Sequence, residues 1–300
     1  MASNSSLRTG FEYAAILAVL FAFFGGINFS KRDRSDKREE WTSRTSVDKT
    51  QSLVFQDGDL VCPQYNFDAH IFSVAPLIIH ISNFVTREEA RHLIALSEQN
   101  WQPSTVFNAG QEYSDDKVRK SEKARIERDK TVQCIEARAL AFQGWPKDTF
   151  IERLWTQRYT APDGHYAHHY DWGSANPNAR RASTFMVYLE ANCTGGSTHF
   201  PLVQKPSDPR WCDYIECPSA PKQRSGDAEV AEQEAGGSGV SFRPVPYSAV
   251  FWENFDSEGR GWKEGLHAGN PVLTGTKIGL NIWSWYQKGL KLEQVVGENV

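Results

Sequence analysis

The stretch His165-Tyr-Ala-His-His-Tyr-Asp171 contains three of the eight histidines of the chain. Within it, His169 and Asp171 stand two residues apart. On a β-strand, residues i and i+2 point to the same face, so both side chains can reach one ion while His168 points away. Two histidines and one carboxylate on one face, with open positions, are typical of a non-haem Fe(II) site. A lone His-x-Asp pair also occurs in surface turns and in buried hydrogen-bonded pairs. Residues elsewhere in the chain are needed to distinguish a metal site from these alternatives.

A second stretch, Leu266-His-Ala-Gly-Asn-Pro-Val-Leu-Thr-Gly-Thr-Lys277, offers the missing histidine. His267 precedes a Gly-Asn-Pro turn, and Lys277 stands on the strand expected to follow. The neighbours of this lysine are apolar or aromatic: Ile278, Leu280, Ile282 and Trp283. A buried ammonium group is costly unless it meets an anion, and the carboxylate of a bound 2-oxo acid would be such an anion. The alternative is a lysine whose amine reaches water from a strand edge.

These residues resemble the motifs of the prolyl 4-hydroxylase family of Fe(II)/2-oxoglutarate dioxygenases. The matching segments are Arg119-Lys-Ser121, Arg158-Tyr159, Tyr166 to Asp171, Arg181-Ala-Ser-Thr184 leading to Tyr188-Leu189, Gly195-Gly-Ser-Thr198-His-Phe200-Pro201, and Leu266 to Lys277. The resemblance runs from about Ile78 to Tyr286. The chain departs from the family pattern at Ser197, where glutamate is usual, and in the turn 160–165, which is one residue longer.

The resemblance implies a role for seven residues. His169, Asp171 and His267 would bind Fe(II), and Lys277 would pair with the distal carboxylate of 2-oxoglutarate. Further roles would fall to Tyr159 and Thr198, as hydrogen-bonding partners of the cosubstrate, and to Trp283, as an aromatic wall of the substrate pocket or a simple core residue. We expect His168 and His199 to lie beside the site or on the surface, and not to be extra ligands.

The implied activity is hydroxylation of peptidyl proline at the 4-position, with release of succinate and CO₂. It would use Fe(II), 2-oxoglutarate and O₂, and family members often use L-ascorbate to re-reduce the iron. Two alternatives stay open: a related dioxygenase acting on another residue or a small molecule, and a catalytically inactive, membrane-tethered binding protein.

The fold expected is α+β, with helices packed on one side of a β-rich core, which the resemblance makes a double-stranded β-helix (jelly roll). Thr86 and Glu89 form a capping box that opens one helix, and 127–143 has the apolar spacing of a second. Short β-branched or aromatic runs predict strands at 152–159, 183–190, 248–252 and 277–286. The segment 204–243 has the composition of a flexible surface insertion.

The N-terminal part differs in composition from the rest. Residues 13–29 carry no charge and are long enough, at the short limit, for a transmembrane signal anchor. A short tail, 1–12, precedes them, a polar stalk at 30–60 follows, and the dioxygenase domain covers 61–290. We expect a single-pass protein of the endoplasmic reticulum membrane with a lumenal catalytic domain. The five basic residues that follow the span, against Arg8 before it, favour the opposite orientation.

Composition and cysteine count restrict the alternatives further. The net charge of −4 and the pI of about 6.1 argue against a nucleic-acid partner. Five cysteines leave at least one unpaired, and Cys212 and Cys217 could form a local disulfide in an oxidising lumen. Asn192-Cys-Thr194 matches the N-glycosylation acceptor pattern. The resemblance implies a proline-containing protein or peptide as substrate, and the apolar segment 13–29 predicts contact with a membrane.

Overall fold

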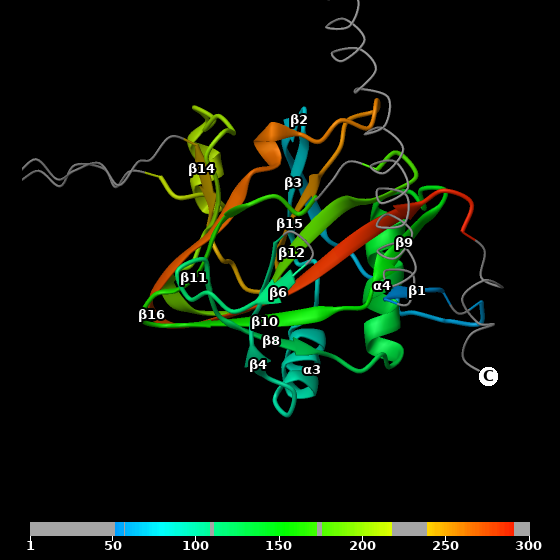
Figure 1. Ribbon diagram of the computed structural model, residues 1–300, viewed down its shortest axis with the longest axis horizontal. Helices are drawn as coiled ribbons and strands as arrows, with labels where there is room; N and C mark the ends of the chain where they lie inside the picture. Colours follow the sequence, from blue (N-terminus) through cyan, green and yellow to red (C-terminus); the bar gives the residue numbers. More distant parts are fainter. Residues whose placement is uncertain (1–51, 57, 109–110, 173–175, 218–238, 291–300) are drawn as a thin grey trace, which may run out of the picture. The chain divides into compact units, whose positions relative to one another are not determined.

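The computed structural model describes residues 52–56, 58–108, 111–172, 176–217 and 239–290 (Figure 1). The predicted tail, the anchor at 13–29 and most of the stalk lie outside these residues. None of the helices in the described ranges is long and apolar enough to cross a membrane. The described residues from Leu53 onward belong to one compact unit, and its first strand lies inside the segment predicted as a stalk.

Sixteen strands, two α-helices and two 3₁₀ helices make up the described chain. In chain order they are β1 (Leu53–Val54), β2 (Asp68–Val74), β3 (Leu77–Ser82), α3 (Arg87–Ser97), β4 (Gln102–Pro103), β5 (Val106–Asn108), β6 (Gln111–Tyr113), β7 (Arg119–Lys120), β8 (Glu122–Arg125), α4 (Lys130–Phe142), β9 (Thr149–Glu152), β10 (Trp155–Thr160), β11 (Gly164–His169), β12 (Ala179–Gly195), β13 (Thr198–Phe200), η1 (Pro209–Asp213), β14 (Val240–Phe242), β15 (Ala249–Glu253), η2 (Lys263–Gly265) and β16 (His267–Gln287).

Two long strands, β12 and β16, organise the sheet. They pair antiparallel from Ala179–Gln287 at one end to Gly195–Val272 at the other. The main path of the 14-stranded sheet runs β2-β3-β15-β12-β16-β10-β8-β4, and β16 also pairs with β9, β11 and β13. In Figure 1, β16 runs across the molecule from orange to red. The predicted jelly-roll-like, β-rich core is confirmed.

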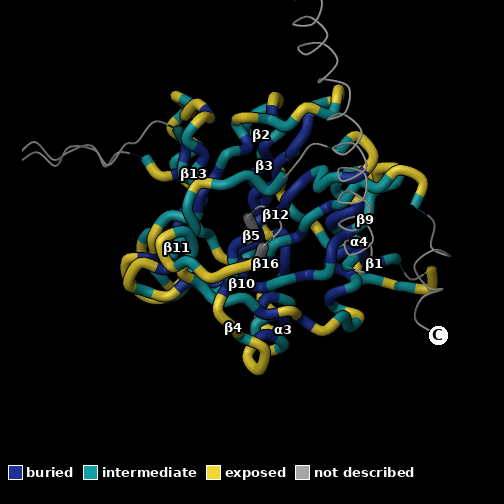
Figure 2. The backbone as a smooth tube through the Cα atoms, viewed as in Figure 1, coloured by how far each residue is buried: buried dark blue, intermediate teal, exposed yellow. Residues whose placement is uncertain are grey.

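Successive side chains along each strand of this sheet point to opposite faces. On β12 and β16, alternate residues pack into one buried cluster with α3 and α4; the strand members are Phe185, Val187, Leu189, Ile278, Leu280 and Ile282. The helices contribute Ala90, Leu93, Val132, Ile135, Ala139 and Leu140. The buried strands under the helices are dark blue in Figure 2. Both helices therefore cover one side of the sheet, as the order of the elements predicts.

The intervening residues of the same strands face the other way. A second buried cluster contains Met186 and Tyr188 from β12 and Val250 and Trp252 from β15. Phe200, on β13, and Phe242, on β14, complete it. The space between these strands holds the polar residues described below.

The helix α3 begins where the capping box predicts, and α4 begins at Lys130, three residues after the predicted start at 127. The Thr86 hydroxyl accepts the backbone N–H of Glu89, and the Glu89 carboxylate accepts the N–H of Thr86, which completes the capping box of α3. The Asp129 carboxylate caps α4 by accepting the N–H of Val132. These side chains satisfy backbone donors that the first turn of a helix leaves without a partner.

Three predicted boundaries differ from the structure. The strand predicted at 152–159 is interrupted, because β9 ends at Glu152 and β10 begins at Trp155. The predicted Gly269-Asn-Pro271 turn lies inside β16, because Asn270 and Pro271 find backbone partners on the Gly195–Ser197 segment, where the pairing register shifts. The flanks of the predicted insertion form η1 and β14, and only 218–238 lies outside the described residues.

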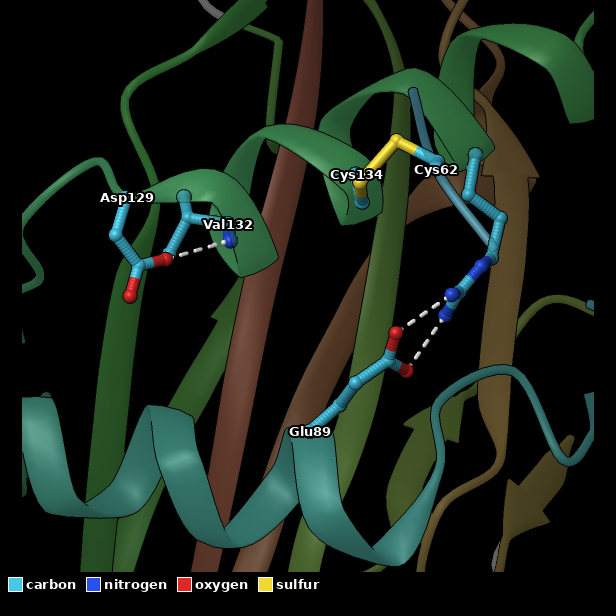
Figure 3. Close-up of a disulfide and its surroundings, with 6 residues drawn as sticks. Cys62, Glu89, Asp129, Val132 and Cys134 are labelled. Atoms are coloured by element: carbon cyan, nitrogen blue, oxygen red, sulfur yellow. Dashed lines mark hydrogen bonds and ion pairs between the residues drawn. A yellow bond between two sulfur atoms is a disulfide. The ribbon is translucent and has the colours of Figure 1, made fainter. Parts of the chain in front are cut away.

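Two disulfides connect the described chain. Cys212 is bonded to Cys217, as the spacing suggests, and Cys62 is bonded to Cys134 across 72 residues. Figure 3 shows the second bond joining α4 to the segment before β2, with Asp129 at the start of the same helix. Cys193 is free.

The two disulfides should differ in what they contribute to stability. Loop entropy predicts that Cys62→Ala/Cys134→Ala lowers the free energy of unfolding by about 4 kcal/mol, against about 2 kcal/mol for Cys212→Ala/Cys217→Ala. Urea denaturation of the two double variants measures the difference. Equal losses would mean that closure of the longer loop is not the main contribution.

Candidate metal centre

Three predicted ligands converge between β11 and β16. His169 ends β11, Asp171 follows two residues later, and His267 begins β16, directly paired with His169. The His169 Nε2 and His267 Nε2 atoms each lie 3.9 Å from an Asp171 carboxylate oxygen. One ligand atom from each residue lies within 4.8 Å of the others. No other group of three such side chains was found in the described ranges.

Both imidazole rings are oriented by the backbone. The Nδ1 atom of His169 lies 2.8 Å from the Ala167 carbonyl oxygen, and Nδ1 of His267 lies 2.9 Å from that of Gly265. A carbonyl can only accept, so each Nδ1 carries the proton and each Nε2 presents a lone pair. This arrangement orients a metal-binding histidine.

The protonation states also suit a divalent cation. Burial, followed by the neighbouring His267, lowers the pKa of His169, so its ring is neutral at physiological pH. Burial alone would raise the pKa of Asp171, but His267, Arg181 and His169 together lower it below its usual range. Two imidazoles and an ionised carboxylate are the donor set of a non-haem Fe(II) site, so the residues fit this metal.

Lys277 extends into the same cavity from β16. Its side chain is buried, its ammonium group donates a 2.6 Å hydrogen bond to the Gly196 carbonyl, and Nζ lies 4.6 Å from the centre of the Tyr159 ring. Gly196 adopts a positive φ of 73°, which an L side chain rarely takes, and this turn positions its carbonyl. Burial lowers the pKa of Lys277 to about 8. A bound carboxylate would supply the anion that this buried ammonium group lacks.

The two predicted polar partners of the cosubstrate line the same cavity. Tyr159, on β10, pairs in register with Lys277, and Thr198 lies on β13. The Tyr188 hydroxyl donates a 2.8 Å hydrogen bond to the Thr198 hydroxyl. The cavity is lined by Gln157, Tyr159, Tyr166, His169, Asp171, Met186, Thr198, Trp252, His267, Ala268, Gly269, Lys277 and Asn281.

Trp283 lies outside this cavity lining and contacts a metal ligand instead. Its indole N–H donates to Asp171 Oδ2 at 3.1 Å, and the Arg181 guanidinium lies 4.0 Å above its ring. His168 and His199 lie 5.6 Å apart, ring centre to ring centre, and belong to no group of three metal-binding side chains. Both predictions about these two histidines agree with that position.

Sequence reasoning assigned no role to several residues that touch the triad. The Tyr166 ring stacks on His169 at 3.6 Å, with Arg119 4.5 Å above its other face. Thr184 donates to Asp171 Oδ2. Tyr166, Arg119 and Thr184 all occur in the segments that carry the resemblance, so their motif positions were the available signal.

A histidine pair and a carboxylate, in a β-rich core beside a buried lysine, are typical of the class of non-haem iron oxygenases that use a 2-oxo acid. Comparisons with known proteins agree. The 2OG-Fe(II) oxygenase superfamily matches residues 154–285. This range contains the triad and Lys277.

Three named proteins are similar to this chain over most of its length. Prolyl 4-hydroxylase 1 of Arabidopsis thaliana is 27% identical over 73% of this chain and 72% of its own length. Probable prolyl 4-hydroxylase 10 of the same plant is 28% identical, over 71% of this chain and 70% of its own. The 2OG complex of a viral collagen prolyl hydroxylase from Paramecium bursaria Chlorella virus-1 is 21% identical, with a TM-score of 0.47, over 70% of this chain and 96% of that one. The chain is therefore similar to the 2OG-Fe(II) oxygenases and, among them, to prolyl 4-hydroxylases.

Replacing Lys277 by methionine should weaken 2-oxoglutarate binding. A hydrogen bond to a charged group contributes roughly 1.5–3 kcal/mol, so we expect the dissociation constant to rise about 10- to 100-fold. Metal binding by the triad should persist. Equilibrium titration of the metal-loaded protein measures both, and an unchanged 2-oxoglutarate affinity in Lys277→Met would remove this lysine from the site.

The wild-type affinity should also depend on pH. The neutral amine has no charge to offer, so binding should weaken as the pH rises through the lysine pKa of about 8. Lys277→Met should lack this dependence.

Proposed function

We propose that the chain hydroxylates prolyl residues of a peptide or protein substrate at the 4-position, as its relatives' names state for them. The position of Lys277 beside the His169–Asp171–His267 triad, in one cavity, carries the proposal. This arrangement places a metal site and a site for a carboxylate in one cavity.

The bound cofactor supplies the oxidation: Fe(II), O₂ and 2-oxoglutarate convert a C–H bond to C–OH, while the cosubstrate becomes succinate and CO₂. The protein binds and orients. His169, Asp171 and His267 would hold the iron, and Lys277 would hold the distal carboxylate. Thr198, whose oxygen accepts from Tyr188, keeps its own proton free to donate toward the cosubstrate.

Apolar side chains form part of the cavity wall. Trp252 and Met186 line it on the side of the second buried cluster, and the Trp252 ring lies 4.7 Å from the His267 ring. An apolar wall strengthens the interaction of the buried Lys277 with an anion. It also limits the escape of reactive oxidants into water. We include L-ascorbate in the proposal as the reductant that restores Fe(II) after turnover without substrate.

A proline-rich peptide tests the reaction. Incubation with Fe(II), 2-oxoglutarate, O₂ and ascorbate should add one oxygen to proline, as mass spectrometry with fragmentation can locate. His169→Ala is the matched control, since it should bind little iron and release no succinate.

The other outcomes separate the alternatives. Succinate release with an unmodified peptide, stimulated by another residue or a small molecule, would identify a related dioxygenase. No iron-dependent decarboxylation under any condition would favour an inactive binding protein.

We further propose that the protein is anchored in the endoplasmic reticulum membrane by residues 13–29, with the catalytic domain in the lumen. Two disulfides in the folded unit support an oxidising compartment, although the basic residues after the span favour the opposite orientation. Asn192 is exposed on β12, where a glycan would meet no buried surface.

Glycosylation reports this orientation, because the acceptor sequon is modified only in the lumen. Digestion with an N-glycosidase should increase the electrophoretic mobility of the expressed protein, and Asn192→Gln should abolish the shift. Digestion of the catalytic domain by a protease added to sealed microsomes would instead place it in the cytosol.

A further inference from the structure

The carboxylate of Asp171 is held by more side chains than a metal ligand requires. Its Oδ2 atom accepts hydrogen bonds from Thr184 Oγ1 at 2.8 Å and from Trp283 Nε1 at 3.1 Å. Two donors on one oxygen define the rotation of the carboxylate group about its side chain. The other oxygen, Oδ1, is the atom that lies 3.9 Å from His169 Nε2.

Arg181 connects this carboxylate to the backbone that carries it. One guanidinium nitrogen, NH1, donates to the Asp171 carbonyl at 3.0 Å and lies 3.7 Å from Oδ1. The central carbon of the same guanidinium lies 4.0 Å from the centre of the Trp283 ring. Arg181 therefore contacts both Asp171 and one of the two donors that orient it.

Glu152 determines the plane of that guanidinium. Its two oxygens accept from Arg181 Nε at 2.9 Å and from NH2 at 3.1 Å, a bidentate pair that leaves NH1 directed at Asp171. The two side chains are 18% and 5% exposed, for Arg181 and Glu152. A planar fork held at two points has little freedom to rotate.

Glu152 reaches this position from outside the segments that carry the ligands. It is the last residue of β9, a strand paired with β16 at Ser284–Tyr286 and, through Glu152 itself, with Leu53 of β1. A buried ion pair is weak evidence for stability, because apolar residues of similar volume often do as well. In this ion pair, Arg181 also donates a hydrogen bond to the metal ligand Asp171, and this contact points to a role of the pair in the site.

We propose that Glu152 is a positioning residue for the iron ligand Asp171, acting through Arg181 and the Trp283 ring. The proposal rests on the proposed metal site and not on the identity of the substrate. Loss of the Glu152 charge would free the guanidinium to rotate, and the carbonyl and carboxylate of Asp171 would lose their fixed orientation. Metal affinity would fall without any ligand being removed.

The test compares two charge-removing variants, Glu152→Gln and Glu89→Gln. Glu89 forms a similar bidentate pair with Arg138, at 2.7 and 2.8 Å, between α3 and α4 (Figure 3). Each substitution keeps the side-chain shape and weakens one Arg–Glu pair. Co²⁺ is the probe, because its visible absorption reports ligand geometry and it does not oxidise under the conditions of the titration.

Glu152→Gln should bind Co²⁺ roughly 10-fold more weakly than wild type, as is typical when a partner of a metal ligand is lost. Its Co²⁺ spectrum should change, while Glu89→Gln should keep the wild-type affinity and spectrum. Urea unfolding of both metal-free variants shows the general cost of losing an ion pair. Equal Co²⁺ affinities for the two variants would overturn the proposal.

Co²⁺ binding by Arg181→Lys is a second test of the proposal, and it replaces the first if Glu152→Gln does not fold. Lysine keeps the positive charge but lacks the planar fork. We expect the same loss of Co²⁺ affinity, and wild-type affinity would overturn the proposal. These measurements involve no peptide, so they stand even if the hydroxylation of proline fails its own test.

Discussion

The antiparallel pairing of β12 with β16 is the constraint on which the rest of the structure depends. Because side chains alternate along a strand, one set of residues on this pair packs against α3 and α4, and the other set faces the cavity. A shift of one residue in the register would exchange the two sets and turn Lys277 toward the helices. The same pairing that builds the core therefore delivers Lys277 to the site.

Charged groups are buried inside this core, and their partners explain why the chain tolerates them. Asp171 lies among two histidines, Thr184, Trp283 and Arg181, and the arginine in turn is held by Glu152. Lys277 contacts the Gly196 carbonyl and the face of the Tyr159 ring. Neither carries a negative charge to offset the cost of burying the ammonium group. A dicarboxylic ligand would provide the missing charge. The binding of the cosubstrate and the burial of this lysine are thus two aspects of one electrostatic requirement.

Much of this arrangement could be predicted from local patterns. The capping box of α3, the apolar spacing of α4 and the Cys212–Cys217 pair each depend on residues close together in the chain, and all agree with the structure. The boundaries of β16 could not be predicted from local patterns. A Gly-Asn-Pro sequence such as 269–271 usually favours a turn, but here backbone partners on Gly195–Ser197 hold it in a strand. The Cys62–Cys134 bond joins positions 72 residues apart, and no spacing rule selects that pairing.

By itself, the sequence determined the kind of chemistry: the residue types at His169, Asp171, His267 and Lys277, and their order, indicate an iron and 2-oxoglutarate site. Only the tertiary structure decided how those residues are oriented and what supports them. The direct pairing of His169 with His267, the turn of Trp283 toward Asp171, and the reach of Glu152 from β9 to Arg181 all depend on contacts between distant strands. Periodicity states which face of a strand a residue occupies. The partner across that face is set by sheet register and long-range packing, which no local pattern encodes.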